Sequence, residues 1–223
     1  MTKLTTTARR GAATMLALTF LLGVGVVTGQ SASAALPASV SGPIKRADAA
    51  LATAKKELAL DHPVRANDAL TVVQRQVRLA NTAAGAQIGK PPVDPESDDI
   101  PGPPAVMAAL SLDHRVASGV VPLFKGQARP RIVDSLLLTL EVTHKRRNAL
   151  LGKVIALPAE GDFGEYADLI ADKLAIYGQE VTQVKSALAT YTLTPAARDG
   201  LQIALVRVTA TKAKVQKAFG GGE

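Results

Sequence analysis

The feature that most constrains the fold of this chain is the spacing of its apolar residues between positions 43 and 219. These residues recur at alternating steps of three and four, which places them on one face of an α-helix. Prolines and short polar segments interrupt the spacing at several points, and the residue before a proline avoids helical geometry. No segment shows a convincing two-residue alternation. We therefore predict an all-α fold.

Two helices are predicted in the first third of the chain, over residues 43–60 and 63–86. Pro63 ends the first helix and is tolerated in the first turn of the second. Asp61 is a residue type that caps a helix start. Because the connection is short, we expect residues 35–89 to form an N-terminal helical hairpin with two antiparallel helices.

A proline-rich acidic segment at residues 90–104 is expected to form a stiff linker after the hairpin. Short connections separate the helices predicted beyond it, and short connections favour antiparallel neighbours. We therefore predict an up-down four-helix bundle over residues 105–219, followed by a flexible tail at 220–223. Its helices are expected at about 104–121, 130–156, 162–191 and 194–219.

Residues 1–34 have the three parts of a cleavable secretory signal peptide. A basic start precedes an apolar run at residues 15–27, and small residues at 32–34 suit cleavage after Ala34. The run is shorter than the roughly 20 residues that cross a membrane, so no stable membrane insertion is expected after cleavage. The protein is therefore expected to be secreted, either extracellular or in the cell envelope. The pair Arg9-Arg10 leaves open whether export is general or twin-arginine.

The composition limits which partners the protein can bind and which residues can form its core. Removal of residues 1–34 takes away three basic and no acidic residues, which lowers the net charge from +7 to +4. This charge suits loose attraction to anionic polymers and is too small for a nucleic-acid binder. The chain has no cysteine and no tryptophan, so disulfides are excluded and the core must consist of Ala, Leu and Val. Such usage is typical of bacterial exported proteins.

His114 and His144 are candidate metal ligands, because each falls on the apolar face of a predicted bundle helix. Glu141 precedes His144 by three residues, which places both side chains on one face of their helix. Glu-x-x-His is half of the pattern that di-metal helical bundles use. His114, Glu141 and His144 together therefore suggest a mononuclear site for a divalent transition metal.

A structural role is the preferred interpretation of the same residues. One Glu-x-x-His pair supplies too few ligands, and the expected register places Leu110 rather than His114 opposite Glu141. In this interpretation the two histidines are partly buried and bonded to neighbours. Glu141 then pairs with Lys145, four residues further along the same helix.

Two further charged groups are expected to be solvated. Glu165, Asp168 and Asp172 share one helix face, where acids near a helix start are favoured by its dipole. The basic run at residues 145–147 suits phosphate-rich polymers, but no aromatic residues accompany it as in a nucleic-acid platform. Neither group by itself defines a site.

Sequence motifs of the common catalytic sites are absent, including His-Glu-x-x-His, Gly-x-Ser-x-Gly and the phosphate-binding glycine loops. An envelope hydrolase with an unrecognised carboxylate site stays an alternative, although the chain is poor in the aromatic residues that line sugar clefts. We expect a secreted, non-catalytic helical-bundle protein without a cofactor. It is expected to bind an unidentified partner in the cell envelope or medium, and no nucleic acid.

Overall fold

A computed structural model describes residues 36–90, 102–157, 163–171 and 174–219. These residues form helices joined by short turns, with no strand among them, which confirms the predicted all-α class. The predicted signal peptide, most of the proline-rich linker and the tail lie outside the described residues. The helices are α1 (Ala38–Ala59), α2 (Pro63–Gly85), α3 (Gly102–Val120), η1 (Val121–Phe124), α4 (Pro130–Ile155), α5 (Phe163–Ala171), α6 (Leu174–Thr190) and α7 (Pro195–Phe219).

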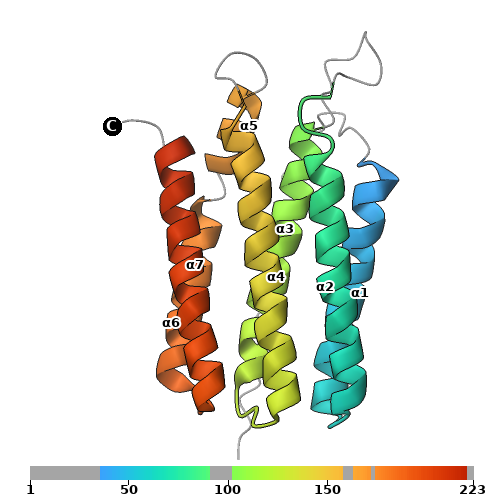
Figure 1. Cartoon of the computed structure of the whole chain (residues 1–223), viewed down its shortest axis with the longest axis vertical. Helices are drawn as coiled ribbons and strands as arrows, with labels where there is room; N and C mark the ends of the chain where they lie inside the picture. The colour runs from blue at the N-terminus through green and yellow to red at the C-terminus, as the bar shows by residue number, and fades with distance from the viewer. Residues whose placement is uncertain (1–35, 91–101, 158–162, 172–173, 220–223) are drawn as a thin grey trace, which may run out of the picture. The chain divides into compact units, whose positions relative to one another are not determined.

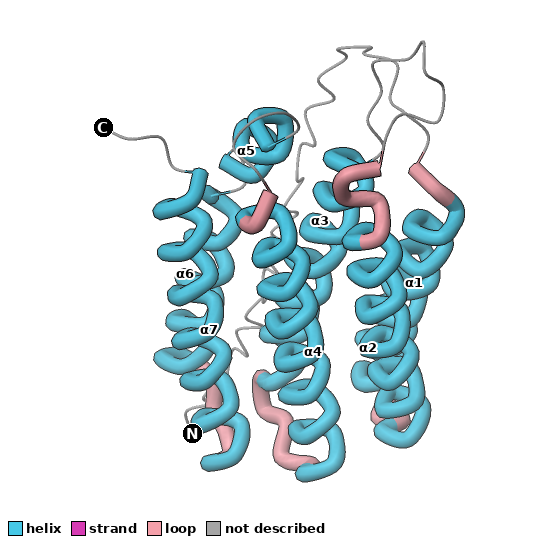
Figure 2. The backbone as a smooth tube through the Cα atoms, turned by 45° about the horizontal axis from the view of Figure 1, so that its top comes forward, coloured by secondary structure: helices cyan, strands magenta, loops and turns pink. Residues whose placement is uncertain are grey.

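The described helices belong to one compact unit, within residues 34–223. In that unit the long helices run alongside one another in two layers (Figures 1 and 2). One layer contains α2, α4 and α7, and the other contains α1, α3 and α6. Successive long helices alternate in direction, so α2, α4 and α7 run in the same direction and their C-terminal ends gather at one end of the unit.

The helical hairpin is formed by α1 and α2, and its buried stripe follows the predicted spacing. Ala47, Leu51 and Ala54 of α1 and Leu70 and Val77 of α2 are buried. The same apolar cluster also contains buried residues of α3, α4, α6 and α7. The hairpin therefore buries its apolar face against the later helices rather than in a core of its own.

The turn between α1 and α2 differs in detail from its prediction. Asp61 adopts a positive φ of 61°, which reverses the chain, and makes no capping hydrogen bond to α2. His62 is the residue before the helix, and Pro63 occupies its first position. The Asp61 carboxylate instead pairs with Arg129, which precedes α4. The Asp61 side chain therefore pairs with Arg129 and does not cap α2 as predicted.

The segment predicted as a single helix at 162–191 is described as two helices, α5 and α6, with residues 172–173 outside the description. Ile170 and Tyr177, whose spacing of seven residues places them on one helix face, are both buried. Glu180, three residues beyond Tyr177, is also buried, whereas Val181, which the heptad spacing places on the core-facing side, is only half-buried. Among the described residues, no helix is both long enough and apolar enough to span a membrane.

The start of α7 combines a proline in the first turn with a capping threonine. Pro195 is the first helical residue, and the Thr194 hydroxyl accepts a hydrogen bond of 3.2 Å from the backbone N–H of Ala197. Replacing Thr194 with alanine removes this cap, so we expect the free energy of unfolding to fall by about 1 kcal/mol. Urea unfolding measures the change. Thr190→Ala, an exposed control whose hydroxyl bonds only to the preceding turn, is expected to have a smaller effect.

Candidate functional site

The three residues predicted as metal ligands are not brought together. Glu141 is 42 % exposed and lies 3.8 Å from both Lys145 and Arg207. The pairing with Lys145 is the one expected from the structural interpretation. His144 is buried, whereas Glu141, three residues earlier, is directed to the surface. The described residues contain no group of three or more His, Asp or Glu side chains placed to hold a metal ion.

Arg147 of α4 and Glu180 of α6 form a buried ion pair. The Arg147 side chain is fully buried, and its Nη1 atom donates hydrogen bonds of 2.8 Å to both carboxylate oxygens of Glu180. The guanidinium also lies over the Tyr177 ring, 4.9 Å from the ring centroid. His114 of α3 joins the pair, with its Nδ1 atom 2.9 Å from Glu180 Oε1. Helical spacing explains the arrangement, because Tyr177 and Glu180 are three residues apart on α6.

A second buried acid, Asp113, precedes His114 on α3. Its Oδ1 atom accepts a 2.9 Å hydrogen bond from the Asn81 side chain of α2, and Oδ2 has no partner among the described residues. Burial raises the pKa of Asp113 to about 8, against the opposing effects of the Asn81 hydrogen bond and the Arg147 charge. Asp113 is therefore mainly protonated and neutral at pH 7.

The other groups around the ion pair are held in defined charge states. Burial, together with the Arg147 charge, lowers the pKa of His144 to about 3, so this histidine is neutral. Burial opposes ionisation of Glu180, but the His114 hydrogen bond and the Arg147 charge outweigh it and lower the Glu180 pKa. Burial also raises the pKa of Tyr177 to about 12. The ion pair is thus accompanied by a neutral Asp113 and a neutral His144, and the contacts of the cluster link α2, α3, α4 and α6.

The exposed charges are distributed unevenly along α2, α4 and α7. The last acidic residues of these helices are Asp68, Glu141 and Asp199. The charged residues that follow them within each helix are all Lys or Arg. Because the three helices run in the same direction, these cations gather near one end of one layer. Lys145 is exposed and pairs with Glu141. We call the other exposed ones the basic face: Arg75, Arg78, Arg146, Lys153, Lys214 and Lys217. None of them forms an ion pair with another described residue.

Side chains of the basic face cross between neighbouring helices where glycine leaves room. A methyl group placed on Gly85 of α2 would lie 3.1 Å from the Lys153 ammonium of α4. One placed on Gly152 of α4 would lie 3.8 Å from the Lys214 ammonium of α7. Lys153 therefore reaches towards α2 and Lys214 towards α4, so neighbouring helices of this layer share cations.

A small pocket lies between α2 and α4 on the basic face. It has a volume of about 90 Å³ and is lined by Asn81, Thr82, Arg146, Ala149, Leu150 and Lys153. Two of its residues are unpaired cations, and a third, Asn81, belongs to the hydrogen-bonded pair with Asp113. Asn81 therefore connects the lining of the pocket to the buried Asp113.

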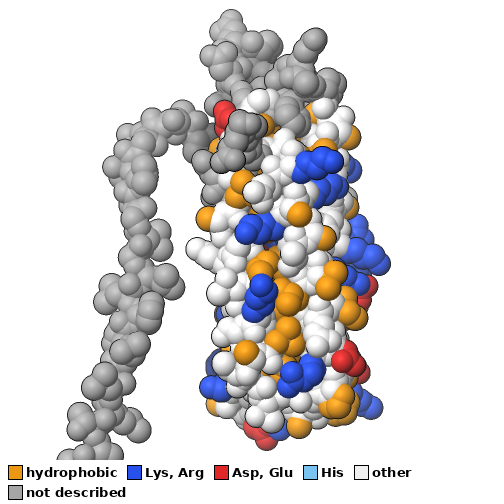
Figure 3. All heavy atoms as spheres, turned by 90° about the vertical axis from the view of Figure 1, so that its left-hand side faces the viewer, with side chains coloured by type: hydrophobic (Ala, Val, Ile, Leu, Met, Phe, Trp, Pro, Cys, Tyr) orange, Lys and Arg blue, Asp and Glu red, His pale blue; other side chains and the backbone are white. Residues whose placement is uncertain are grey.

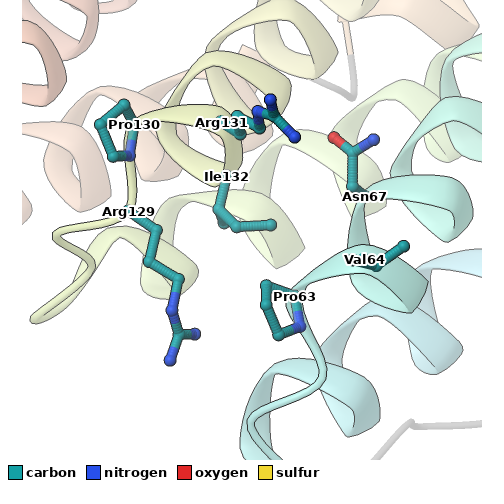
Figure 4. Close-up of a pocket in the computed structure, with 7 residues that line it drawn as sticks. All are labelled: Pro63, Val64, Asn67, Arg129, Pro130, Arg131 and Ile132. Atoms are coloured by element: carbon teal, nitrogen blue, oxygen red, sulfur yellow. The ribbon is translucent and has the colours of Figure 1, made fainter.

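A larger groove, of about 520 Å³, lies where α2 and α4 begin. Figure 4 shows Pro63 and Val64 of α2 facing Pro130 and Ile132 of α4 across it, with Arg129 directed away from the apolar residues. The Arg129 charge is already engaged by Asp61. Another apolar surface includes Ile203 and Val206 of α7, which are 53 % and 69 % exposed. Figure 3, which views the α6–α7 side, shows apolar side chains among scattered Lys and Arg.

No protein-family model, curated protein or solved structure matches this chain. Its function has to be inferred from the charges, cavities and buried groups described above.

Sequence reasoning missed the Arg147–Glu180 pair. The run at 145–147 was expected to be solvated, and this prediction is wrong for Arg147, which is buried, whereas Lys145 and Arg146 are exposed. A signal was present, because Arg147 follows Leu140 and precedes Val154 by seven residues each, which places it on the core-facing stripe. Of the predicted acidic face, Asp168 is exposed; the side chains of the other two acids are outside the description.

Proposed function

We propose that this chain is an exported, non-catalytic protein that binds an anionic polymer of the cell envelope or medium through its basic face. The observation that carries the proposal is the set of exposed cations on α2, α4 and α7 that have no acidic partner among the described residues. Export rests on the sequence of residues 1–34, which are outside the described part of the chain.

Electrostatics supports a polymer rather than a single small ion. Packed helices lie about 8–10 Å apart, and the Debye length at 0.1 M salt is about 10 Å. Cations on neighbouring helices therefore reinforce one another at the surface instead of being screened individually. A chain of repeated negative charges can contact several of them at once, which turns weak single contacts into useful affinity.

The scarcity of aromatic residues in the chain favours recognition of charge along a polymer backbone. The whole chain has three tyrosines, four phenylalanines and no tryptophan, so base stacking of the kind that nucleic-acid binders use has little support. The buried cluster around Arg147 is assigned a structural role, since Arg147, Glu180 and Asp113 are almost entirely removed from water. No specific observation favours the metal-binding or hydrolase alternatives.

The test is the binding of a soluble glycerol-phosphate polymer at 50 mM salt. We expect the variant Arg78→Glu/Lys214→Glu/Lys217→Glu to bind at least about tenfold more weakly, a loss of about 1.4 kcal/mol or more. Binding of the unaltered protein should also weaken steeply as salt is raised, because contacts with exposed charges are screened. Isothermal titration calorimetry measures both effects.

The matched control reverses the same number of exposed cations on α1, as Lys45→Glu/Lys55→Glu/Lys56→Glu. It changes the net charge equally but lies on the other helix layer. This variant is expected to retain most of the affinity. Equal losses in the two variants would mean that net charge alone is responsible, and an absence of binding at 50 mM salt would contradict the proposal itself.

A further inference from the structure

The side of α7 that faces away from the core carries a second heptad spacing. Its residues recur at steps of four, three, four, three and four, and we call them the outer stripe: Asp199, Ile203, Val206, Ala210, Ala213 and Lys217. All six are exposed, whereas Leu201 and Val208 on the opposite side of α7 are fully buried. Alternating steps of three and four form the seam along which two helices pack. The outer stripe therefore offers a face to another helix.

The middle of the outer stripe is apolar. Ile203 and Val206 are 53 % and 69 % exposed, and they border a shallow hollow of about 410 Å³ on α7. The next two residues of the stripe, Ala210 and Ala213, are small and also exposed. Apolar side chains are visible on this side of the molecule (Figure 3). Large side chains on one helix pack well against small ones on another, so the two halves of this apolar middle complement each other in size.

The two ends of the outer stripe carry opposite charges. Asp199 lies near the start of α7 and Lys217 near its end, and neither forms an ion pair with a described residue. Arg198 is turned towards α6, where its Nη1 atom donates to Leu188 O at 3.4 Å, so it does not neutralise Asp199 on the outer stripe. An acid, an apolar middle and a cation thus follow one another along a single helix face.

We propose that a second copy of this chain packs on the outer stripe, so that the two α7 helices run antiparallel about a twofold axis at the middle of the stripe. A twofold axis presents the same surface of both copies to each other, so that surface must complement itself. The register brings three pairs of residues together across the interface, each formed twice: Asp199 with Lys217, Ile203 with Ala213, and Val206 with Ala210.

Charge selects the antiparallel arrangement over a parallel one. In a parallel pair Asp199 would face Asp199 of the second copy, and Lys217 would face Lys217. Like charges placed opposite each other at an interface are unfavourable, whereas the antiparallel pair places opposite charges together at both ends. Gln202, Thr209 and Gln216, which flank the stripe on one side, are uncharged and do not oppose either arrangement.

The inference goes beyond the proposed function and does not depend on it, because only Lys217 belongs to both the outer stripe and the basic face. An interface made by one helix from each copy is small, about 1,200 Å² or less, which is typical of transient association. We therefore expect a dimer that forms and dissociates with protein concentration in the micromolar range.

Sedimentation equilibrium of the full chain tests the charged ends. We expect Asp199→Lys and Lys217→Asp each to weaken dimerisation about tenfold, because like charges then meet at both ends of the interface. An equimolar mixture of the two variants restores opposite charges and should associate as strongly as the unaltered protein. The two substitutions change the net charge in opposite directions, so net charge cannot account for a loss in both.

The apolar middle is tested by Val206→Glu, which places a charge against Ala210 of the second copy and should weaken dimerisation at least about tenfold. The matched control is Val64→Glu on α2, where the valine is 73 % exposed and lies outside the stripe, so dimerisation should not change. A chain that stays monomeric up to about 1 mM, or equal losses in the two glutamate variants, would overturn the proposal. A charge-variant mixture that associates more strongly than the unaltered protein would indicate parallel helices and overturn the antiparallel register.

Discussion

Replacement of Arg147 by methionine is expected to lower the free energy of unfolding by about 3–5 kcal/mol. The substitution leaves the Glu180 carboxylate buried without the guanidinium that donates two 2.8 Å hydrogen bonds to it. An unpaired buried charge is far more costly than the loss of a surface contact. For a chain of this size, we expect the midpoint of thermal unfolding to fall by about 10 °C.

The neighbouring cation provides the matched control. Arg146→Met removes the same charge from an exposed position, so its effect on stability is expected to stay within about 0.5 kcal/mol. The double variant Arg147→Met/Glu180→Leu replaces the whole pair with apolar groups and should recover much of the loss. Guanidinium unfolding measures all three variants. Similar stabilities for Arg146→Met and Arg147→Met would contradict the burial of Arg147.

The stability of the protein is expected to be highest between about pH 4.5 and 6.5 and to fall on both sides. The folded pKa of Asp113 is about 8 and its ordinary value is 3.8, so the folded chain retains a proton that the unfolded chain releases. The contribution of Asp113 to the free energy of unfolding is complete below pH 3.8 and is lost as the pH rises towards 8. His144 has the opposite sign, because its pKa falls from 6.5 to about 3 in the folded chain. Its contribution is present above pH 6.5 and is lost as the pH falls.

Between pH 3.8 and 6.5 the two contributions offset each other, because the free energy of unfolding falls with pH through Asp113 and rises with pH through His144. Above pH 6.5 only Asp113 continues to titrate, at about 1.4 kcal/mol per pH unit. We therefore expect a loss of about 2 kcal/mol between pH 6.5 and 8. On the acid side the lowered pKa of Glu180 adds to the effect of His144, so stability falls again below about pH 4.5.

Asp113→Asn tests this assignment directly. Asparagine retains an oxygen for the Asn81 hydrogen bond and cannot ionise, so the decline between pH 6.5 and 8 should disappear in this variant. Asp134→Asn removes an exposed carboxylate from α4 and should keep the decline of the unaltered protein. Urea unfolding at half-unit pH intervals gives the curves. A decline of equal slope in the Asp113→Asn variant would contradict a buried, protonated Asp113.

Much of the fold could be predicted because helix formation leaves a local, periodic signature. The apolar residues of α2, from Ala66 through Leu70, Val73 and Val77 to Ala80, recur at steps of three and four and are buried throughout. The start of α7 at Pro195 follows from a capping threonine and a proline that tolerates the first turn. Such features depend only on residues within a few positions of one another.

The candidate site could be predicted only in part. The buried polar groups have partners about 30 or more residues away in the chain, as for Asp113 with Asn81 and for Arg147 with Glu180. A local sequence pattern does not indicate which helices pack against each other. Glu141 was expected beside His144 or Lys145, and the packing of α4 against α7 also brings it to Arg207. The position of Arg147 on the apolar stripe of α4 could have identified it as buried, whereas Glu180 lies beside the heptad positions of its helix and gave no such signal.

The sequence by itself determined the all-α class, the faces that the helices bury and the absence of disulfides, because these follow from spacing and composition. The tertiary structure decided which charges are buried and which are free. Arg146 and Arg147 are adjacent in the chain, yet helix rotation of about 100° per residue directs one to solvent and the other into the core. The parallel course of α2, α4 and α7 likewise assembled the basic face from cations that are far apart in the sequence.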